Sequence, residues 1–283
     1  MLNNNNTKFQ LDLNHFKLSY SKSYPNTNIP DTNFLEWFIG FTEGIDNSCF
    51  TINNSKVNNH PYPNFIITQS TNNIQILYYI QNKLGFGKVI KKGNNISQYI
   101  VINNKDISII ANLFNGNIVL PKTFNKYSLW IKCYNNNSKS YYNSKILINN
   151  SIITPKFNNY WICGFTDSKG HFKCSIINNS KAYRYQFILV QKGIENIPSL
   201  IAIRKVLGGK VISYPAKNVY QLIINGTLNI KNVINYFDQH NLLTKKKKSY
   251  KIWKDIGIDI LNKKHLVSIS RKELKAISKQ INQ

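Results

Sequence analysis

The chain has 283 residues, enough for two domains of ordinary size, each with its own hydrophobic core. Hydrophobic residues make up 42% of it, which excludes an intrinsically disordered protein, and no apolar run approaches the about 20 residues that span a membrane. Lys and Arg number 37 against 12 Asp and Glu, a formal net charge of +25, which favours a nucleic-acid partner over a basic surface kept for solubility.

The first half predicts a mixed order of strands and helices. Apolar alternation and helical spacing, interrupted by Gly85 and Pro121, predict strands at 50–53 and 65–69, a helix at 72–84, strands at 88–91 and 98–102, and helices at 105–114 and 124–134. Residues 135–159 are rich in Asn, Ser, Tyr and Lys, and this composition indicates a linker.

The second half repeats this order. We predict strands at 171–177 and 183–191, a helix at 197–207, strands at 210–214 and 220–224, and helices at 228–240, 245–261 and 268–280. With a motif helix in front, each half reads α-β-β-α-β-β-α-α. The predicted fold class is therefore α+β, with two pseudo-symmetric domains. Each has a four-strand antiparallel sheet with helices on one face and the other face open.

One eight-residue pattern opens both halves. It reads Trp37-Phe38-Ile39-Gly40-Phe41-Thr42-Glu43-Gly44 and then, 161 − 37 = 124 residues later, Trp161-Ile162-Cys163-Gly164-Phe165-Thr166-Asp167-Ser168. A repeat of this kind predicts two similar domains related by a pseudo-two-fold axis. We therefore expect an N-terminal extension at 1–31, a first domain at 32–134, the linker at 135–159 and a second domain at 160–283.

The two motif copies, the repeated element order and the basic charge resemble the LAGLIDADG homing endonucleases and maturases over residues 32–282. The stretches 74–80, 84–90, 113–117, 236–238 and 242–247 are similar to the mitochondrial intron-encoded branch. The resemblance implies that the motif helices pack together at the domain interface, through Gly40, Phe41, Gly164 and Phe165. It also implies an acid at the eighth motif position of each helix, which holds Mg²⁺ for phosphodiester cleavage.

Neither copy has that acid. The eighth positions are Ile45 and Lys169, so no intact catalytic residue is predicted. Three acids are alternative candidates: Asp46, Glu43 and Asp167. Glu43 and Asp167 lie two residues before the eighth motif position. This offset is a helical rotation of about 200°, so their side chains should point away from the metal position.

An insertion accompanies the defect in the first copy. Phe50 and Phe172 are 172 − 50 = 122 residues apart, two fewer than the motif tryptophans, so two extra residues lie between Gly44 and Phe50. Asp46 lies inside this insertion and is the single candidate metal ligand. We therefore expect no cofactor, with Mg²⁺ required only if endonuclease activity is retained.

Basic and amide side chains supply the expected nucleic-acid contacts. On 183–191, Arg184 and Gln186 alternate with apolar residues and should reach outward, and Gln69 should do so on 65–69; the alternative is a solvated sheet surface. The lysine run before the helix at 245–261 either contacts phosphates or is a solvated helix start. The full predicted set is Gln69, Lys88, Lys91, Lys92, Arg184, Gln186, Lys210, Lys245, Lys246 and Lys247.

These observations predict a cleavage-deficient nucleic-acid-binding protein rather than an enzyme, with RNA favoured over DNA. It would act as a maturase-like group I intron splicing factor or as a structural subunit of a ribonucleoprotein such as the mitochondrial ribosome. The alternative is an active Mg²⁺-dependent homing endonuclease that makes a site-specific double-strand cut. Because both motifs lie in one chain, no obligate homodimer is needed, and no membrane partner is expected.

Composition also suggests the compartment. Asn, Ile and Lys dominate, as AT-rich organellar codons would produce, and the polar N-terminus lacks import and secretory patterns. The four cysteines show neither a CxxC pair nor zinc spacing, which favours reduced thiols. We therefore expect an organelle-encoded protein of the mitochondrial matrix.

Overall fold

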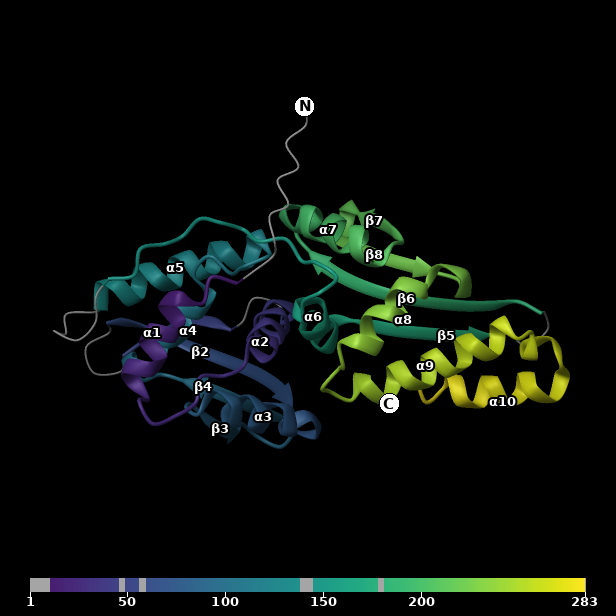
Figure 1. Ribbon diagram of the computed structural model, residues 1–283, viewed down its shortest axis with the longest axis horizontal. Helices are drawn as coiled ribbons and strands as arrows, with labels where there is room; N and C mark the ends of the chain where they lie inside the picture. Colours follow the sequence, from purple (N-terminus) through teal and green to yellow (C-terminus); the bar gives the residue numbers. More distant parts are fainter. Residues whose placement is uncertain (1–10, 46–48, 56–59, 138–144, 178–180, 283) are drawn as a thin grey trace, which may run out of the picture.

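The protein is described by a computed structural model that covers residues 11–45, 49–55, 60–137, 145–177 and 181–282. Two units lie side by side, each a four-strand antiparallel sheet with helices, and the helices α2 (Thr32–Gly44) and α6 (Trp161–Lys169) stand between them (Figure 1). The predicted fold class is confirmed, because the strands of both sheets follow the same spatial order: first, second, fourth and third of each unit.

The first unit follows the predicted order closely. After α2 come β1 (Phe50–Asn54), β2 (Pro61–Ser70), α3 (Ile74–Leu84), β3 (Lys88–Lys91), β4 (Ile96–Val101), α4 (Asn104–Phe114) and α5 (Pro121–Asn137). Asp31 caps α2, since its carboxylate accepts the Phe34 N–H at 2.8 Å. Pro121 does not merely separate two helices; it is the first residue of α5, where a missing N–H does no harm.

The second unit repeats these elements. They are β5 (His171–Ile176), β6 (Tyr183–Lys192), α7 (Ile197–Leu207), β7 (Lys210–Tyr214), β8 (Val219–Asn225), α8 (Lys231–Gln239), α9 (Lys246–Leu261) and α10 (Ser268–Ser278). In each sheet one face is packed under helices. Phe172 of β5, for example, has its ring 5.3 Å from that of Trp253 on α9, and Phe50 lies equally close to Trp130 on α5.

One helix was not predicted. α1 (Asn14–Ser23) packs against α4 and buries Phe16 and Tyr20 completely. The Tyr20 hydroxyl donates to the Leu84 carbonyl at 3.1 Å, which ties the N-terminal segment to the end of α3. The spacing of Leu13, Phe16 and Tyr20 carried the signal, but the polar residues around them obscured it.

The segment between the two units runs along the first. Ile118 forms an isolated parallel bridge with Ile152, and the Asn115 and Asn135 side chains hold the backbone of Leu147 and Ile146. Within the described ranges, none of the helices has the length and apolar character needed to cross a membrane.

Candidate nucleic-acid interface and cleavage centre

The two motif helices cross with their backbones in direct contact. A Cβ built on Gly40 would lie 2.1 Å from the Trp161 carbonyl oxygen, and one on Gly164 would lie 1.9 Å from that of Trp37. Only glycine fits at either position, so these two residues set how closely α2 and α6 approach. The rings of Phe41 and Phe165 stack on Trp37 and Trp161, with centroids 4.8 Å apart in both copies.

The sixth-position acid of the first motif is buried in a ring of N–H donors. Glu43 is 2% exposed, and its carboxylate accepts from the backbone N–H of Leu120 at 2.7 Å and from that of Val119 at 3.1 Å. The indole N–H of Trp161, on the other motif helix, donates to it at 2.8 Å. Burial raises the pKa of Glu43 to about 8, although these donors oppose the shift.

The second motif mirrors this arrangement. Asp167 is 4% exposed and accepts from the Trp37 indole at 2.8 Å, from the Leu243 N–H at 2.8 Å and from the Thr244 N–H at 3.0 Å. The Thr244 hydroxyl donates as well, at 2.5 Å. Burial again raises the carboxyl pKa, against the same kind of donors. Each acid therefore binds the tryptophan of the opposite helix, and neither carboxylate is left open for a metal ion.

At the eighth motif positions the structure places no acid among the residues it describes. Ile45 ends α2 and packs against the core, and Lys169 is the last residue of α6, where a cation suits the helix dipole. Asp46 lies outside the described residues. Among the described residues, no group of three His, Cys, Asp or Glu side chains is arranged to hold a metal ion.

A second lysine joins Lys169 at the end of α6. Lys246 donates from its Nζ to the carbonyl of Gly170, the residue that follows the motif helix. Burial lowers the pKa of Lys246 to about 8, while Asp167 partly opposes this. Partial desolvation, together with Lys246 and Lys169, lowers the pKa of His171. The end of the second motif helix is thus a cationic site, which repels a divalent metal and attracts phosphate.

The second sheet has a polar and basic open face. Phe172 and Cys174 of β5 are buried under the helices, so Lys173 points the other way, opposite Gln186 of β6. Arg184 and Gln186 lie on the same open face, as predicted, and so does Lys210; the Gln186 amide donates to Asn225 at 2.5 Å. Lys173 was missed by sequence reasoning, although its alternation with Phe172 and Cys174 was there to find it.

The first sheet corrects one expected orientation. Gln69 shares its face with Phe65 and Ile67, which are fully buried, so the expectation that it points outward is wrong. Thr68 points outward instead and accepts from the Gln98 amide at 3.0 Å. On β3 the register places Lys88 on the open face opposite Ile100, and Lys91 on the helix-covered side opposite buried Ser97; Lys92 lies in the turn that follows.

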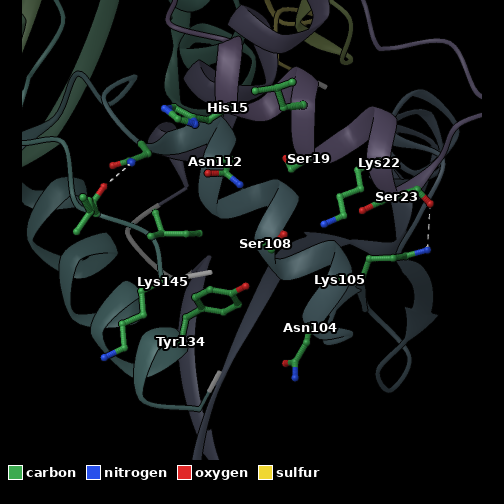
Figure 2. A pocket seen from close by; sticks show the side chains of 14 residues that line it. His15, Ser19, Lys22, Ser23, Asn104, Lys105, Ser108, Asn112, Tyr134 and Lys145 are labelled. Atoms are coloured by element: carbon green, nitrogen blue, oxygen red, sulfur yellow. Dashed lines mark hydrogen bonds between the residues drawn. The ribbon is translucent and has the colours of Figure 1, made fainter. Parts of the chain in front are cut away.

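A large hollow lies away from these faces. It measures about 770 Å³ and is formed by α1, α4, the end of α5 and residues 145–147 of the segment between the two units (Figure 2). Its polar lining includes Ser19, Ser108 and Asn112, and two of its three lysines point away from it. Lys105 points to the Ser23 carbonyl at 3.5 Å and lies over the Tyr24 ring, and Lys145 points outward (Figure 2). The hollow is separate from the motif helices and from both open sheet faces.

Comparison with known proteins agrees with this architecture. A sequence model described as LAGLIDADG endonuclease matches residues 38–134 and 162–257. The chain is 34% identical over 238 residues to the probable intron-encoded endonuclease 4 of Neurospora crassa. This alignment covers 82% of the present chain and 41% of the Neurospora protein. It is 30% identical over 213 residues to the cox1 intron-2 37.2 kDa protein of Schizosaccharomyces pombe, covering 74% and 64%. The chain thus spans roughly half the length of these relatives.

Solved structures share the fold. The homing endonuclease I-GzeII in complex with its DNA target superimposes with a TM-score of 0.73 at 21% identity, over 88% of this chain and 98% of that one. The meganuclease I-AabMI bound to uncleaved DNA gives 0.70 at 19% identity, over 88% and 99%. At these identities the likeness is evidence for the fold alone.

Proposed function

Because this chain belongs to the LAGLIDADG endonuclease family, we propose that it is a member that binds nucleic acid without cutting both strands of DNA, and that its ligand is RNA. The observation that carries the proposal is the end of α6. Lys169 stands at the eighth motif position, and Lys246 lies against the next residue, Gly170. Two-metal cleavage needs carboxylate oxygens at this point, and ammonium groups cannot ligate Mg²⁺.

The sixth-position acids cannot easily replace the missing ones. Glu43 and Asp167 would have to leave their backbone and indole donors to reach a metal ion, and each lost hydrogen bond in a buried site is unfavourable by about 1–3 kcal/mol. Their positions fit an architectural role, in which each carboxylate joins one motif helix to the other.

The scaffold for holding nucleic acid is kept. The open face of the second sheet presents Lys173, Arg184 and Lys210, which suit phosphate and base-edge contacts. A retained binding surface beside a motif that lacks its cleavage acids fits a splicing or ribonucleoprotein role, for which cutting is not needed. The intron-encoded relatives support a mitochondrial origin, and we place the protein in the matrix.

DNA is the competing ligand, since both solved neighbours above are described with bound DNA and the Neurospora crassa relative is named a probable intron-encoded endonuclease. In that case Asp46 would supply a carboxylate for Mg²⁺ and double-strand cleavage would be retained. The two functions make opposite predictions for a single substitution, Asp46→Asn, which removes the charge while preserving the shape of the side chain.

The test selects ligands from randomised RNA and randomised duplex DNA pools at the same salt concentration, and then incubates selected duplexes with Mg²⁺. We expect the enriched ligands to be RNA and the duplexes to stay uncut. Double-strand cleavage by the wild-type chain that Asp46→Asn abolishes would overturn the proposal in favour of an endonuclease. Binding of neither pool above the level of an unrelated polyanion would refute nucleic-acid recognition altogether.

A further inference from the structure

The surface between α8 and α9 is a groove lined with lysines. It measures about 660 Å³ and contains Lys245, Lys247, Lys248, Lys251 and Lys254, together with Phe237 and Tyr250. Because it lies on the helix-covered side of the second sheet, it is separate from the open face described above.

The lysine run at the start of α9 divides between two sides of the helix. Lys246 turns inward to the Gly170 carbonyl. Tyr250 and Trp253 also turn inward, since their rings pack on Phe172 of the sheet. Lys247, Lys248 and Lys251 consequently point away from the sheet and are exposed. Residues four apart on a helix are about 6 Å apart along its axis, so these lysines form a row along the groove.

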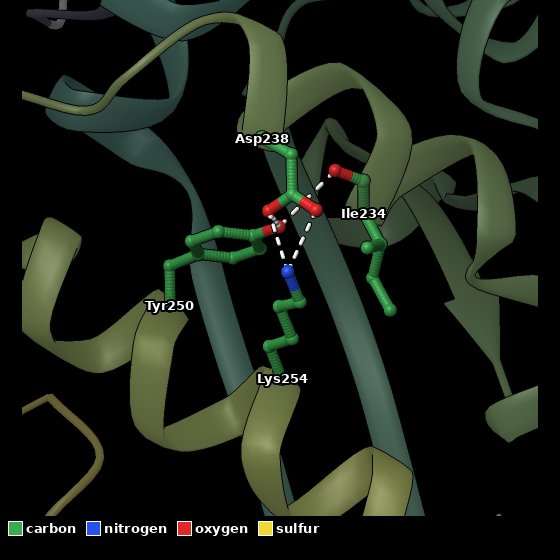
Figure 3. A network of polar contacts seen from close by, with 4 residues as sticks. All are labelled: Ile234, Asp238, Tyr250 and Lys254. Atoms are coloured by element: carbon green, nitrogen blue, oxygen red, sulfur yellow. Dashed lines mark hydrogen bonds and ion pairs between the residues drawn. The ribbon is translucent and has the colours of Figure 1, made fainter.

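Two acids line the groove, Asp238 and Asp255, and Asp238 is already paired. Lys254 Nζ lies 2.6 Å from one carboxylate oxygen of Asp238 and 2.8 Å from the other, and the Tyr250 hydroxyl donates to the same group at 2.8 Å (Figure 3). Although burial opposes it, these contacts lower the pKa of Asp238. Lys245, Lys247, Lys248 and Lys251 have no ion pair with a described acid, so their charge is available to an anion.

The first unit shows that the fold does not require this row. Tyr127 and Tyr250 are 250 − 127 = 123 residues apart, as are Trp130 and Trp253, and both tryptophans pack on the equivalent phenylalanine. The positions on α5 that match Lys247, Lys248, Lys251 and Lys254 are therefore Phe124, Asn125, Ser128 and Ile131. None of these four is charged, so these four lysines belong to the second copy alone, whereas Lys245 of the groove matches Lys122.

We propose that the α8–α9 groove binds the phosphate backbone of a nucleic-acid strand, as a second contact surface behind the sheet. The inference rests on the proposed function and adds a place where a second segment of the same folded RNA, or a separate strand, is held. The row of ammonium groups contacts successive phosphates, and the ion pair with Lys254 offsets the charge of Asp238.

The experiment compares two triple variants of the full chain. K247Q/K248Q/K251Q removes three charges from the groove, and K205Q/K231Q/K272Q removes three from exposed sites on α7, α8 and α10 that do not line it. Affinity for a mixed-sequence single-stranded RNA, and for DNA of the same sequence, is measured across a range of salt concentrations. Circular dichroism checks that both variants are folded.

We expect the groove variant to lower the slope of log affinity against log salt by about 2, since each lost phosphate contact on a single strand contributes about 0.7. The control variant should change this slope by less than about half of that amount. A lower salt slope for RNA alone would assign the groove to RNA. A lower slope for both RNA and DNA would assign it to the phosphate backbone that the two share. Equal salt slopes for the two variants, with the wild-type chain still binding, would overturn the proposal that the groove binds phosphate and leave the proposed function intact. No binding by the wild-type chain would refute the proposed function itself.

Discussion

Trp161 of α6 donates its indole N–H to the Glu43 carboxylate of α2 at 2.8 Å. The pseudo-symmetric pair, Trp37 of α2 and Asp167 of α6, has the same length. Both pairs join residues more than a hundred positions apart, and both are buried. The acids and tryptophans of the repeated motif thus hold the two domains in one fixed arrangement, a role separate from cleavage.

Removing one of these carboxylates should weaken the interface. We expect Glu43→Gln to reduce the free energy of unfolding by about 1–3 kcal/mol, because an amide nitrogen would face N–H donors that the carboxylate now accepts. Urea denaturation followed by tryptophan fluorescence measures the change. Asp167→Asn should behave in the same way, since its donors are equivalent.

A double-mutant cycle separates this pair from general damage. Trp161→Phe combined with Glu43→Gln should show a coupling energy of at least about 0.5 kcal/mol. Trp130→Phe is the matched control, because the Trp130 indole donates to the Asn64 carbonyl within the first unit. Coupling of equal size between Trp130→Phe and Glu43→Gln would contradict a specific bond between the helices.

The helix crossing should not tolerate a methyl group. Gly164→Ala places a Cβ 1.9 Å from the Trp37 carbonyl oxygen, so we expect a loss of at least about 3 kcal/mol in unfolding free energy, or separation of the two units. Gly93→Ala is the control. Its Cβ meets no described atom within 4 Å, so only its left-handed backbone, at φ +74°, opposes the change. Equal effects of the two substitutions in thermal unfolding would show that the crossing is not tightly packed.

Stability should fall as the pH rises. The pKa of Glu43 is raised to about 8 in the folded protein, above its ordinary value near 4.5, so the folded state binds more protons between these values. The free energy of unfolding should therefore be greatest below about pH 4.5 for this group and decrease up to about pH 8. Asp167 acts in the same direction. Lys246, with its pKa lowered to about 8, has the opposite effect above that pH.

Glu43→Gln removes one of these titrating groups and so tests the assignment. Its unfolding free energy, measured by denaturant titration across the pH range, should decline less steeply than that of the wild-type chain. An unchanged slope would mean that Glu43 has an ordinary pKa in the folded protein.

Two lysines on one strand test the binding face. Lys88 lies on the open face of the first sheet and Lys91, three residues later, on the opposite side. If nucleic acid lies on the open face, Lys88→Gln should weaken binding and lower the salt slope by about 0.7–0.9, as expected for one phosphate contact. Lys91→Gln should change the slope much less. Fluorescence anisotropy measures the affinity of both variants. A larger effect of Lys91→Gln than of Lys88→Gln would place the ligand on the helical side of this sheet.

The fold was largely predictable because its signals are local and occur twice. Periods of two and of 3.6 residues marked most strands and helices, and Gly85 and Pro121 marked element boundaries. The orientation of Gln69 was not predictable with the same certainty, because a strand has two faces and a one-residue error exchanges them. The absence of acids at the positions of Ile45 and Lys169 could be recognised from the alignment of the two halves alone.

The sequence by itself determined that two domains meet through paired glycine-containing helices and that the usual cleavage acids are absent from their places. Only the tertiary structure decided where the remaining carboxylates go. The donors of Glu43 come from Val119, Leu120 and Trp161, residues 76 to 118 positions away, and no local pattern specifies such partners. It also divided one lysine run between an inward site at Gly170 and an outward groove, because helix α9 turns successive residues to different sides.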